Sequence, residues 1–240
     1  MSGSGTGTLA VTGGTSTVAG RTDVPFLLER VSGPATEPVT LAAMKLHLRG
    51  FANVTDLDTE VSEIITTARE WVEEYTGRAL MDQTWRITIN NDSRTCPAPS
   101  AGDMGWWPAW TRWLAQREIL LMRSPVLAIT SFVTVDSAGT ETAVAPTVYA
   151  LTEPDSKWPR IAGLSGSTWN GSTLKIEFRA GYANAALSPA EGSEVVPARL
   201  IQAMKLYASA LYDRDEKMMD KLIEAAQNLV KPERCGLGIA

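Results

Sequence analysis

His47 is the only histidine in the chain, so a Ser-His-Asp or Cys-His catalytic arrangement would have to use it. The segment around it is otherwise rich in Leu and Met, and the sequence contains no Gly-x-Ser-x-Gly motif. One histidine with two distant cysteines, Cys96 and Cys235, is also a poor ligand set for zinc. We therefore expect His47 to pack or to lie at the surface, and we expect no metal or cofactor site.

Carboxylates are plentiful, and two pairs stand close in the sequence, Glu73 with Glu74 and Asp213 with Asp215. Successive helical residues point in different directions, so these carboxylates are poor partners for acid–base catalysis. We interpret them as solvated faces. The sequence contains no phosphate-binding loop, Walker lysine motif or calcium loop. The sequence thus predicts that the protein is not an enzyme.

The segment Gly105–Gln116 contains four tryptophans in a loop-like region, about 97–117, that also holds three prolines. Two interpretations stay open: the rings could cap a β unit as a satellite core, or they could anchor a partner, because Trp adds much contact area at low entropy cost. Insertion into a membrane interface is disfavoured, because lysines are missing nearby. The candidate partner-binding residues here are Trp106, Trp107, Trp110 and Trp113.

The segment Val61–Arg78 has apolar residues at helical spacing and predicts an amphipathic helix. Asp56 or Asp58 is placed to cap its start, and Gly77 can adopt the left-handed turn that ends it. Its other face is expected to stay in water or to meet a charged neighbour. That face carries Glu60, Glu63, Arg69, Glu70, Glu73 and Glu74.

Three further helices are predicted. Thr40 is expected to cap a short one over Leu41–Leu48. The segment Leu200–Tyr212, after Pro197, is apolar nearly all round and is typical of a buried helix. An amphipathic segment then runs to Val230, and it is either a fourth bundle helix or a partner-binding segment. Its candidate contact residues are Leu222, Ile223, Leu229 and Val230.

Between these helices the hydrophobic period becomes two, which predicts strands. The alternation is clearest around Trp85–Ile89 and Leu174–Phe178. Further strands are expected at Glu118–Met122, Ala128–Val135 and Glu141–Val144, with a turn over Asp136–Thr140. Together these segments predict a small antiparallel β unit.

The predicted fold class is α+β: a small helical bundle with an inserted antiparallel β module and a flexible N-terminal arm. The bundle is expected to comprise residues 38–82 and 183–231, and the β module residues 83–182. Residues 1–37 form the arm, whose first part is almost wholly Gly, Ser, Thr, Ala and Val, and residues 232–240 form a C-terminal tail.

The composition limits the possible functions. The net charge of the 240-residue chain is −5 and no Lys/Arg cluster occurs, so the sequence does not favour phosphate binding. No apolar run approaches the roughly 20 residues that span a bilayer, and no signal sequence is evident. Two distant cysteines indicate free thiols. We expect a protein that is made in the cytoplasm and has no membrane partner.

Five short blocks resemble the head–tail connector family, the head-completion adaptors of tailed phages and gene-transfer particles. The most specific pair is the Glu-Tyr-Thr-Gly-Arg turn at 74–78 followed later by Arg-Ala-Gly-Tyr at 179–182. The family usually has an Arg three positions after a Tyr near the end of its third helix, whereas Arg214 comes two positions after Tyr212. The matching blocks are Pro38–Arg49, Ala68–Leu80, Gln83–Ile89, Lys175–Tyr182 and Pro197–Tyr212.

This resemblance implies a virion structural protein of the neck, at the head–tail junction. Copies of the chain would form a cyclic, dodecameric ring beneath the portal protein and would dock a stopper or tail-completion protein on the tail side. Packaged double-stranded DNA would pass through the lumen without specific binding, because mild negative charge repels phosphates. Candidate positions at the lumen or between subunits are Glu63, Glu70, Glu73, Glu74, Arg78 and Arg214.

Two other functions remain open from the sequence. A non-catalytic DNA-packaging or nucleic-acid-binding phage protein would need a basic face, which the sequence does not show. An unrecognised hydrolase would depend on His47 or on a buried carboxylate.

Overall fold

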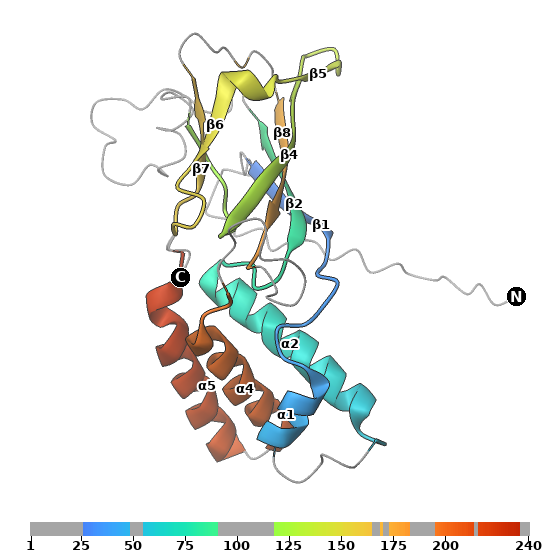
Figure 1. The fold of residues 1–240 in the computed structure, drawn as a ribbon, viewed down its shortest axis with the longest axis vertical. Helices are drawn as coiled ribbons and strands as arrows, with labels where there is room; N and C mark the ends of the chain where they lie inside the picture. The colour runs from blue at the N-terminus through green and yellow to red at the C-terminus, as the bar shows by residue number, and fades with distance from the viewer. Residues whose placement is uncertain are drawn as a thin grey trace, which may run out of the picture.

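The computed structural model describes residues 26–48, 55–90, 118–164, 169, 173–182, 195–213 and 216–235. In this part of the chain a helical bundle lies at one end and a β module at the other (Figure 1), so the predicted α+β class is confirmed. None of the described helices is long and apolar enough to cross a membrane. The tryptophan-rich segment, residues 1–25 of the arm, Arg214 and residues 236–240 lie outside the described residues.

Among the described residues the bundle contains four α-helices, and α4 lies between α2 and α5 (Figure 1). This central position explains the apolar residues all round α4, whose Leu200 and Met204 are fully buried. A short 3-10 helix, η3, follows α5 directly. The bounds are α1 Leu41–His47, α2 Asp58–Thr76, α4 Ala198–Asp213, α5 Glu216–Val230 and η3 Lys231–Glu233.

Two of the three predicted helix caps are present. The Thr40 hydroxyl accepts a hydrogen bond from the Ala43 N–H at 3.2 Å. Gly77 has φ 72° and ends α2 in the left-handed conformation. The predicted aspartate cap of α2 is wrong: Leu57 occupies the N-cap position without a side-chain hydrogen bond, and the Asp58 carboxylate instead accepts from Lys45. Lys45 is buried, so its ammonium group needs that partner.

A five-stranded antiparallel sheet forms the larger part of the β module, in the order β1-β2-β8-β4-β5. The two strands with the clearest alternation, β2 and β8, pair at its centre, with Trp85 opposite Phe178 and Ile87 opposite Ile176. The predicted turn at Asp136 joins β4 to β5. The bounds are β1 Phe26–Ser32, β2 Gln83–Asn90, β4 Val126–Val135, β5 Glu141–Ala143 and β8 Thr173–Ala180.

The strand β1 corrects the predicted arm, which was expected to include residues 26–32. These residues pair with β2, starting with Phe26 opposite Ile89. Leu28 packs against the core of the β module, whereas Leu27 and Val31 on the other face are 56% and 47% exposed. Because both faces carry apolar residues, the segment lacks the alternation typical of a half-buried strand. The β module therefore includes a strand from before the bundle.

A second, three-stranded antiparallel sheet has the order β3-β7-β6. Only β3, Glu118–Leu120, was expected from the sequence. The 3-10 helix η1, Pro146–Val148, leads into β6, Tyr149–Thr152, and β7 spans Arg160–Gly163. Strands of three or four residues give too short a pattern to be recognised without their partners.

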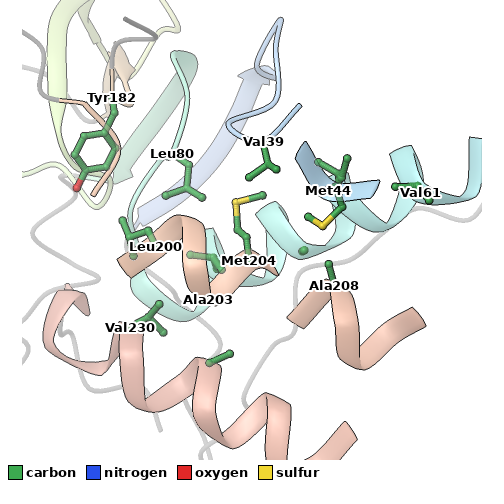
Figure 2. Close-up of a cluster of buried hydrophobic side chains, with 14 residues drawn as sticks. Val39, Met44, Val61, Leu80, Tyr182, Leu200, Ala203, Met204, Ala208 and Val230 are labelled. Carbon is green, nitrogen blue, oxygen red and sulfur yellow. The ribbon is translucent and has the colours of Figure 1, made fainter. Parts of the chain in front are cut away.

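Two hydrophobic cores result, one in each part. The bundle core is built by the four helices and the segments beside them, and Figure 2 shows Leu80 and Tyr182 reaching into it from the connections to the sheet. Its fully buried residues include Met44, Val61, Ala68, Val72, Leu200, Ala203, Met204, Ala208, Ala226 and Val230. The core of the β module is centred on Ile87, Ile119, Leu121, Phe132, Ile161, Leu174, Ile176 and Phe178.

Candidate functional site

The chain passes between the β module and the bundle in three places, after β1, after α2 and after β8, and we call the region around the last two the junction. Its backbones approach closely: Met81 and Tyr182 form a parallel β-bridge. Gly181 has φ 140°, and a Cβ atom there would lie 2.0 Å from the Met81 carbonyl oxygen. Only glycine fits this approach.

Glu73 is the central polar residue of the junction. Its carboxylate accepts hydrogen bonds from Arg69 Nη1 at 2.8 Å, from the Leu80 N–H at 2.8 Å and from Gln83 Nε2. Burial raises the pKa of Glu73, against the lowering effects of these bonds and of the Arg69 charge. The expectation of a solvated Glu73 is wrong, because its side chain is only 5% exposed.

Arg78 ties the C-terminal end of the bundle to the junction. Its guanidinium donates to the Tyr182 hydroxyl at 2.6 Å and to the Glu233 carbonyl oxygen at 3.0 Å, and it pairs with the Glu233 carboxylate at 3.1 Å. Arg199 pairs with the same carboxylate, and the Cys235 N–H donates to the Thr76 carbonyl oxygen at 2.6 Å. The described part of the predicted tail, residues 232–235, is thus held against the bundle.

Arg123 approaches the junction from the β module. Its guanidinium lies 4.5 Å from the centroid of the Trp85 ring and donates to the Glu73 carbonyl oxygen at 3.3 Å. Burial lowers the pKa of Arg123. Arg123 also lines a cleft of about 240 Å³ together with Tyr75, Trp158 and Cys235.

This arrangement offers structural contacts, and no reacting pair is evident in it. The nearest candidate nucleophiles, Ser124 and Cys235, contact each other at 3.2 Å. His47 is on α1, which lies away from the junction (Figure 1). Among the described residues, no group of three or more His, Cys, Asp or Glu side chains is placed to hold a metal ion.

The outer side of α2 carries a line of exposed carboxylates, Glu63, Glu70 and Glu74, which we call the acidic flank. Their spacing of seven and four residues places them on one face of the helix, opposite the buried Val61, Ala68 and Val72. Glu70 also pairs with Arg30 of β1 at 3.0 Å. Of the predicted lumen or subunit positions, these three are at the surface, whereas Glu73 and Arg78 are in the junction.

The predicted partner-binding residues of α5 also differ in their exposure to solvent. Leu222 and Ile223 are partly buried, and Leu229 is exposed. Val230 is fully buried in the bundle core, so its expected contact with a partner does not fit its position. In the described chain α5 is the fourth helix of the bundle.

A row of aromatic rings covers the seam between α2 and α4. Trp71 stacks on Tyr207 with ring centroids 4.3 Å apart and on Tyr75 at 5.5 Å. The guanidinium of Arg234 lies 5.3 Å from the Tyr75 ring centroid. These contacts hold the end of the described chain to the outside of the bundle.

Several junction residues were missed from the sequence, chiefly Gln83 and Arg123. One signal was available for Glu73: with Arg69 it forms an i,i+4 pair beside the apolar stripe of α2, where a partly desolvated ion pair is possible. The contact of Arg123 with Trp85 joins residues far apart in the sequence and leaves no local pattern.

No protein-family model and no curated protein matches the sequence. The fold itself is found in gene transfer agents. A chain in the neck of an empty GTA particle, computed with C6 symmetry, is 24% identical with a TM-score of 0.57. A chain in the virion of a native gene transfer agent particle is 23% identical with a TM-score of 0.56.

A third similar chain comes from the neck of a native GTA particle computed with C12 symmetry, with 24% identity and a TM-score of 0.52. Each match covers 83% of this chain and 94% of the other. The likeness therefore includes both the bundle and the β module, and it shows a shared fold.

Proposed function

We propose that this protein is a structural component of a virion neck, a head–tail connector or adaptor of a tailed phage or gene-transfer particle. The observation that carries the proposal is the fold, which is shared across 83% of the chain with chains from gene transfer agent particles, two of them from necks. The resemblance of the sequence blocks at the α2–β2 turn and at the end of β8 supports the same function.

In this proposal the copies form a closed ring at the head–tail junction. The neck structures with the same fold were computed with C6 and C12 symmetry, which supports a cyclic, dodecameric assembly. The ring contacts the portal protein on one side and a stopper or tail-completion protein on the other. It extends the channel for packaged double-stranded DNA, and the net charge of −5 disfavours specific DNA binding.

The junction supports such a mechanical role, because an adaptor must hold two partner-facing ends in a fixed relation. The Glu73 carboxylate of α2 accepts hydrogen bonds from Leu80 and Gln83 on the segment that leads into β2, and Arg78 pairs with Glu233 of the C-terminal segment, so these contacts cross between helix, sheet and C-terminal segment. Breaking one partner of a buried pair leaves an unpaired charge, which is costly. Bundle and β module are therefore expected to move as one unit when a partner loads either end.

The proposal is tested by mixing the purified protein with portal rings of the same particle and imaging the mixture by negative-stain electron microscopy. We expect an added ring of density on one face of the portal. Portal rings that stay bare at high micromolar protein concentration would contradict the proposal.

A variant of this experiment tests the tryptophan-rich segment as a partner anchor. The chain with Trp106, Trp107, Trp110 and Trp113 all replaced by Ser is expected to stay folded and to fail to join portal-containing particles. Trp158→Ser is the matched control, because Trp158 is a 36% exposed tryptophan on the β module. Normal joining by the fourfold variant would remove this segment from the proposed contacts.

A further inference from the structure

The cleft beside the junction combines cationic and apolar side chains. Among the described residues its lining carries three cations, Arg123, Lys157 and Arg234, and one carboxylate, Glu74. Three cations against one carboxylate leave an excess of positive charge at the cleft, although the net charge of the whole chain is −5. The cleft therefore differs in charge from the rest of the molecule.

The carboxylates next to the lining residues already have cations of their own. Glu73, beside Glu74 in the sequence, accepts a hydrogen bond from Arg69 at 2.8 Å. Glu233, beside Arg234, pairs with Arg78 and with Arg199, each at 3.1 Å. These two carboxylates are thus neutralised within the chain and do not pair with the cations of the cleft.

Arg123 is the residue that points to a ligand. In the described chain its Nη1 donates to the Glu73 carbonyl oxygen at 3.3 Å, whereas its buried Nε has no acceptor and no carboxylate pairs with it. Burial lowers the pKa of Arg123, against the raising effect of the Glu73 charge. Buried charges in proteins are normally paired, and a perturbed charge in a cleft is a candidate binding group.

The chemistry of the lining defines what would bind. A guanidinium donates through a planar fork, which matches the two oxygens of a carboxylate. Lys157 and Arg234 are exposed, so they add attraction for a negative charge at the edge of the cleft. The rest of the lining is largely apolar: Leu28, Tyr75, Leu120, Leu121, Met122 and Trp158. The complementary ligand joins a carboxylate to an apolar group.

The size of the cleft favours a protein segment over a free small molecule. Its volume of about 240 Å³ lies below the range of roughly 300–1,000 Å³ that is usual for small-molecule sites. It has room for one or two side chains of a docked chain. We infer that this cleft docks a segment of another protein in which an acidic side chain stands beside an apolar one, with Arg123 binding the carboxylate.

This contact is separate from the portal contact proposed for the tryptophan-rich segment, and it does not depend on the proposed ring. It can be tested on the isolated full-length chain. The probes are the peptide acetyl-Gly-Phe-Glu-Leu-Gly-amide and its counterpart with Gln in place of Glu, which has nearly the same shape and no charge. Inorganic phosphate is titrated in parallel as a small anion without an apolar group.

Binding is followed by ¹⁵N NMR of the Arg123 Nε–H and the Trp85 indole N–H, because the guanidinium lies 4.5 Å from the Trp85 ring centroid. We expect both signals to shift and saturate with the Glu peptide. The Gln peptide is expected to bind at least about tenfold more weakly, because it cannot form charge-assisted hydrogen bonds with the guanidinium. Phosphate is expected to bind more weakly than the Glu peptide.

Variants of the chain locate the contact. Arg123→Gln is expected to bind the two peptides equally, and Arg123→Lys, which keeps the charge without the fork, to retain only part of the preference. Arg86→Gln is the matched control and is expected to keep the full preference. Arg86 is also an arginine of the β module, but it pairs with Glu177 and lies on the opposite face of β2 from Trp85.

Several results would overturn the inference: no saturable shift with the Glu peptide, equal binding of both peptides by the wild type, phosphate binding as tight as the Glu peptide, or an undiminished preference in Arg123→Gln. Circular dichroism first confirms that each variant is folded. If Arg123→Gln does not fold, the peptide comparison on the wild type and on Arg123→Lys decides. The imaging of portal rings tests the proposed function independently, so each can fail while the other stands.

Discussion

The junction and the acidic flank are both built from glutamates of α2, yet their environments are opposite. Glu73 is 5% exposed in its side chain and accepts hydrogen bonds from Arg69, Leu80 and Gln83. Its neighbour Glu74 is exposed on the outer face. One step along a helix turns the side chain by about 100°, which is enough to carry a carboxylate from water into the boundary between two cores.

The comparison teaches that charge on this helix has two separate uses. In the junction each charge has lost its water and needs a partner inside the chain, so its removal affects stability. On the flank Glu63 and Glu74 keep their water, so removing either charge is expected to change the stability of the monomer little and to affect what docks there. Stability and assembly can therefore be tested with different substitutions on the same helix.

The largest effect is expected from Glu73→Ala. It leaves Arg69, Gln83 and the Leu80 N–H without their shared acceptor inside the protein, so we expect a loss of about 3–5 kcal/mol in the free energy of unfolding. Urea unfolding followed by circular dichroism measures it. A loss below about 1 kcal/mol would mean that the junction is hydrated and does not bind the two parts together.

A smaller effect is expected from Tyr182→Phe, which keeps the ring in the bundle core and removes the hydroxyl that accepts from Arg78. Arg78 keeps its bonds to Glu233, so we expect a loss of about 1–2 kcal/mol in the free energy of unfolding. The same urea titration measures it. An unchanged midpoint would show that the hydrogen bond between Arg78 and the Tyr182 hydroxyl contributes nothing measurable to stability.

The pH dependence of stability tests the raised pKa of Glu73. Because burial holds this pKa above 4.5, the folded chain binds the proton more tightly than the unfolded chain. The raised pKa adds to the stability of the folded chain, and this stabilisation is fully present below pH 4.5. It is lost as the pH rises through the raised pKa of the folded chain. We expect the stability of the wild type relative to Glu73→Gln to fall across this window. A relative stability that rises with pH would show that the Arg69 pair outweighs burial.

The smallest effect is expected from Glu74→Ala. The side chain lies on the exposed face, so we expect a change within about 0.5 kcal/mol in the free energy of unfolding of the isolated chain. Thermal unfolding beside the Glu73→Ala variant gives the direct contrast. Similar losses for both variants would remove the distinction between junction and flank.

The sequence predicted those elements whose pattern is long and regular. The alternation around Trp85–Ile89 and Leu174–Phe178 identified the two central strands, because a half-buried strand repeats every second residue. It did not identify β1, because Leu27 and Leu28 place apolar side chains on both faces. The pairing of β1 with β2 depends on residues that lie 52 to 63 positions further along the chain, which a local pattern does not contain.

The same limit applies to the candidate site. Helical spacing places Glu63, Glu70 and Glu74 on one exposed face, and the structure has them there. The sequence placed Glu73 on the same charged face, and this prediction failed. Glu73 is buried by contacts with Gln83 and the backbone of Leu80, which lie on the segment after the helix and leave no mark in the helical pattern. Asp58 was expected to cap α2, but the buried Lys45 of α1 takes its carboxylate. Tertiary partners decide both cases.

The most direct test of the proposed function is electron microscopy of particles made with and without this chain. In particles that contain it, we expect a ring of density between portal and tail into which the bundle and the β module fit. Without it, we expect filled heads that lack attached tails. Complete, tailed and infectious particles made in its absence would contradict the assignment to the neck.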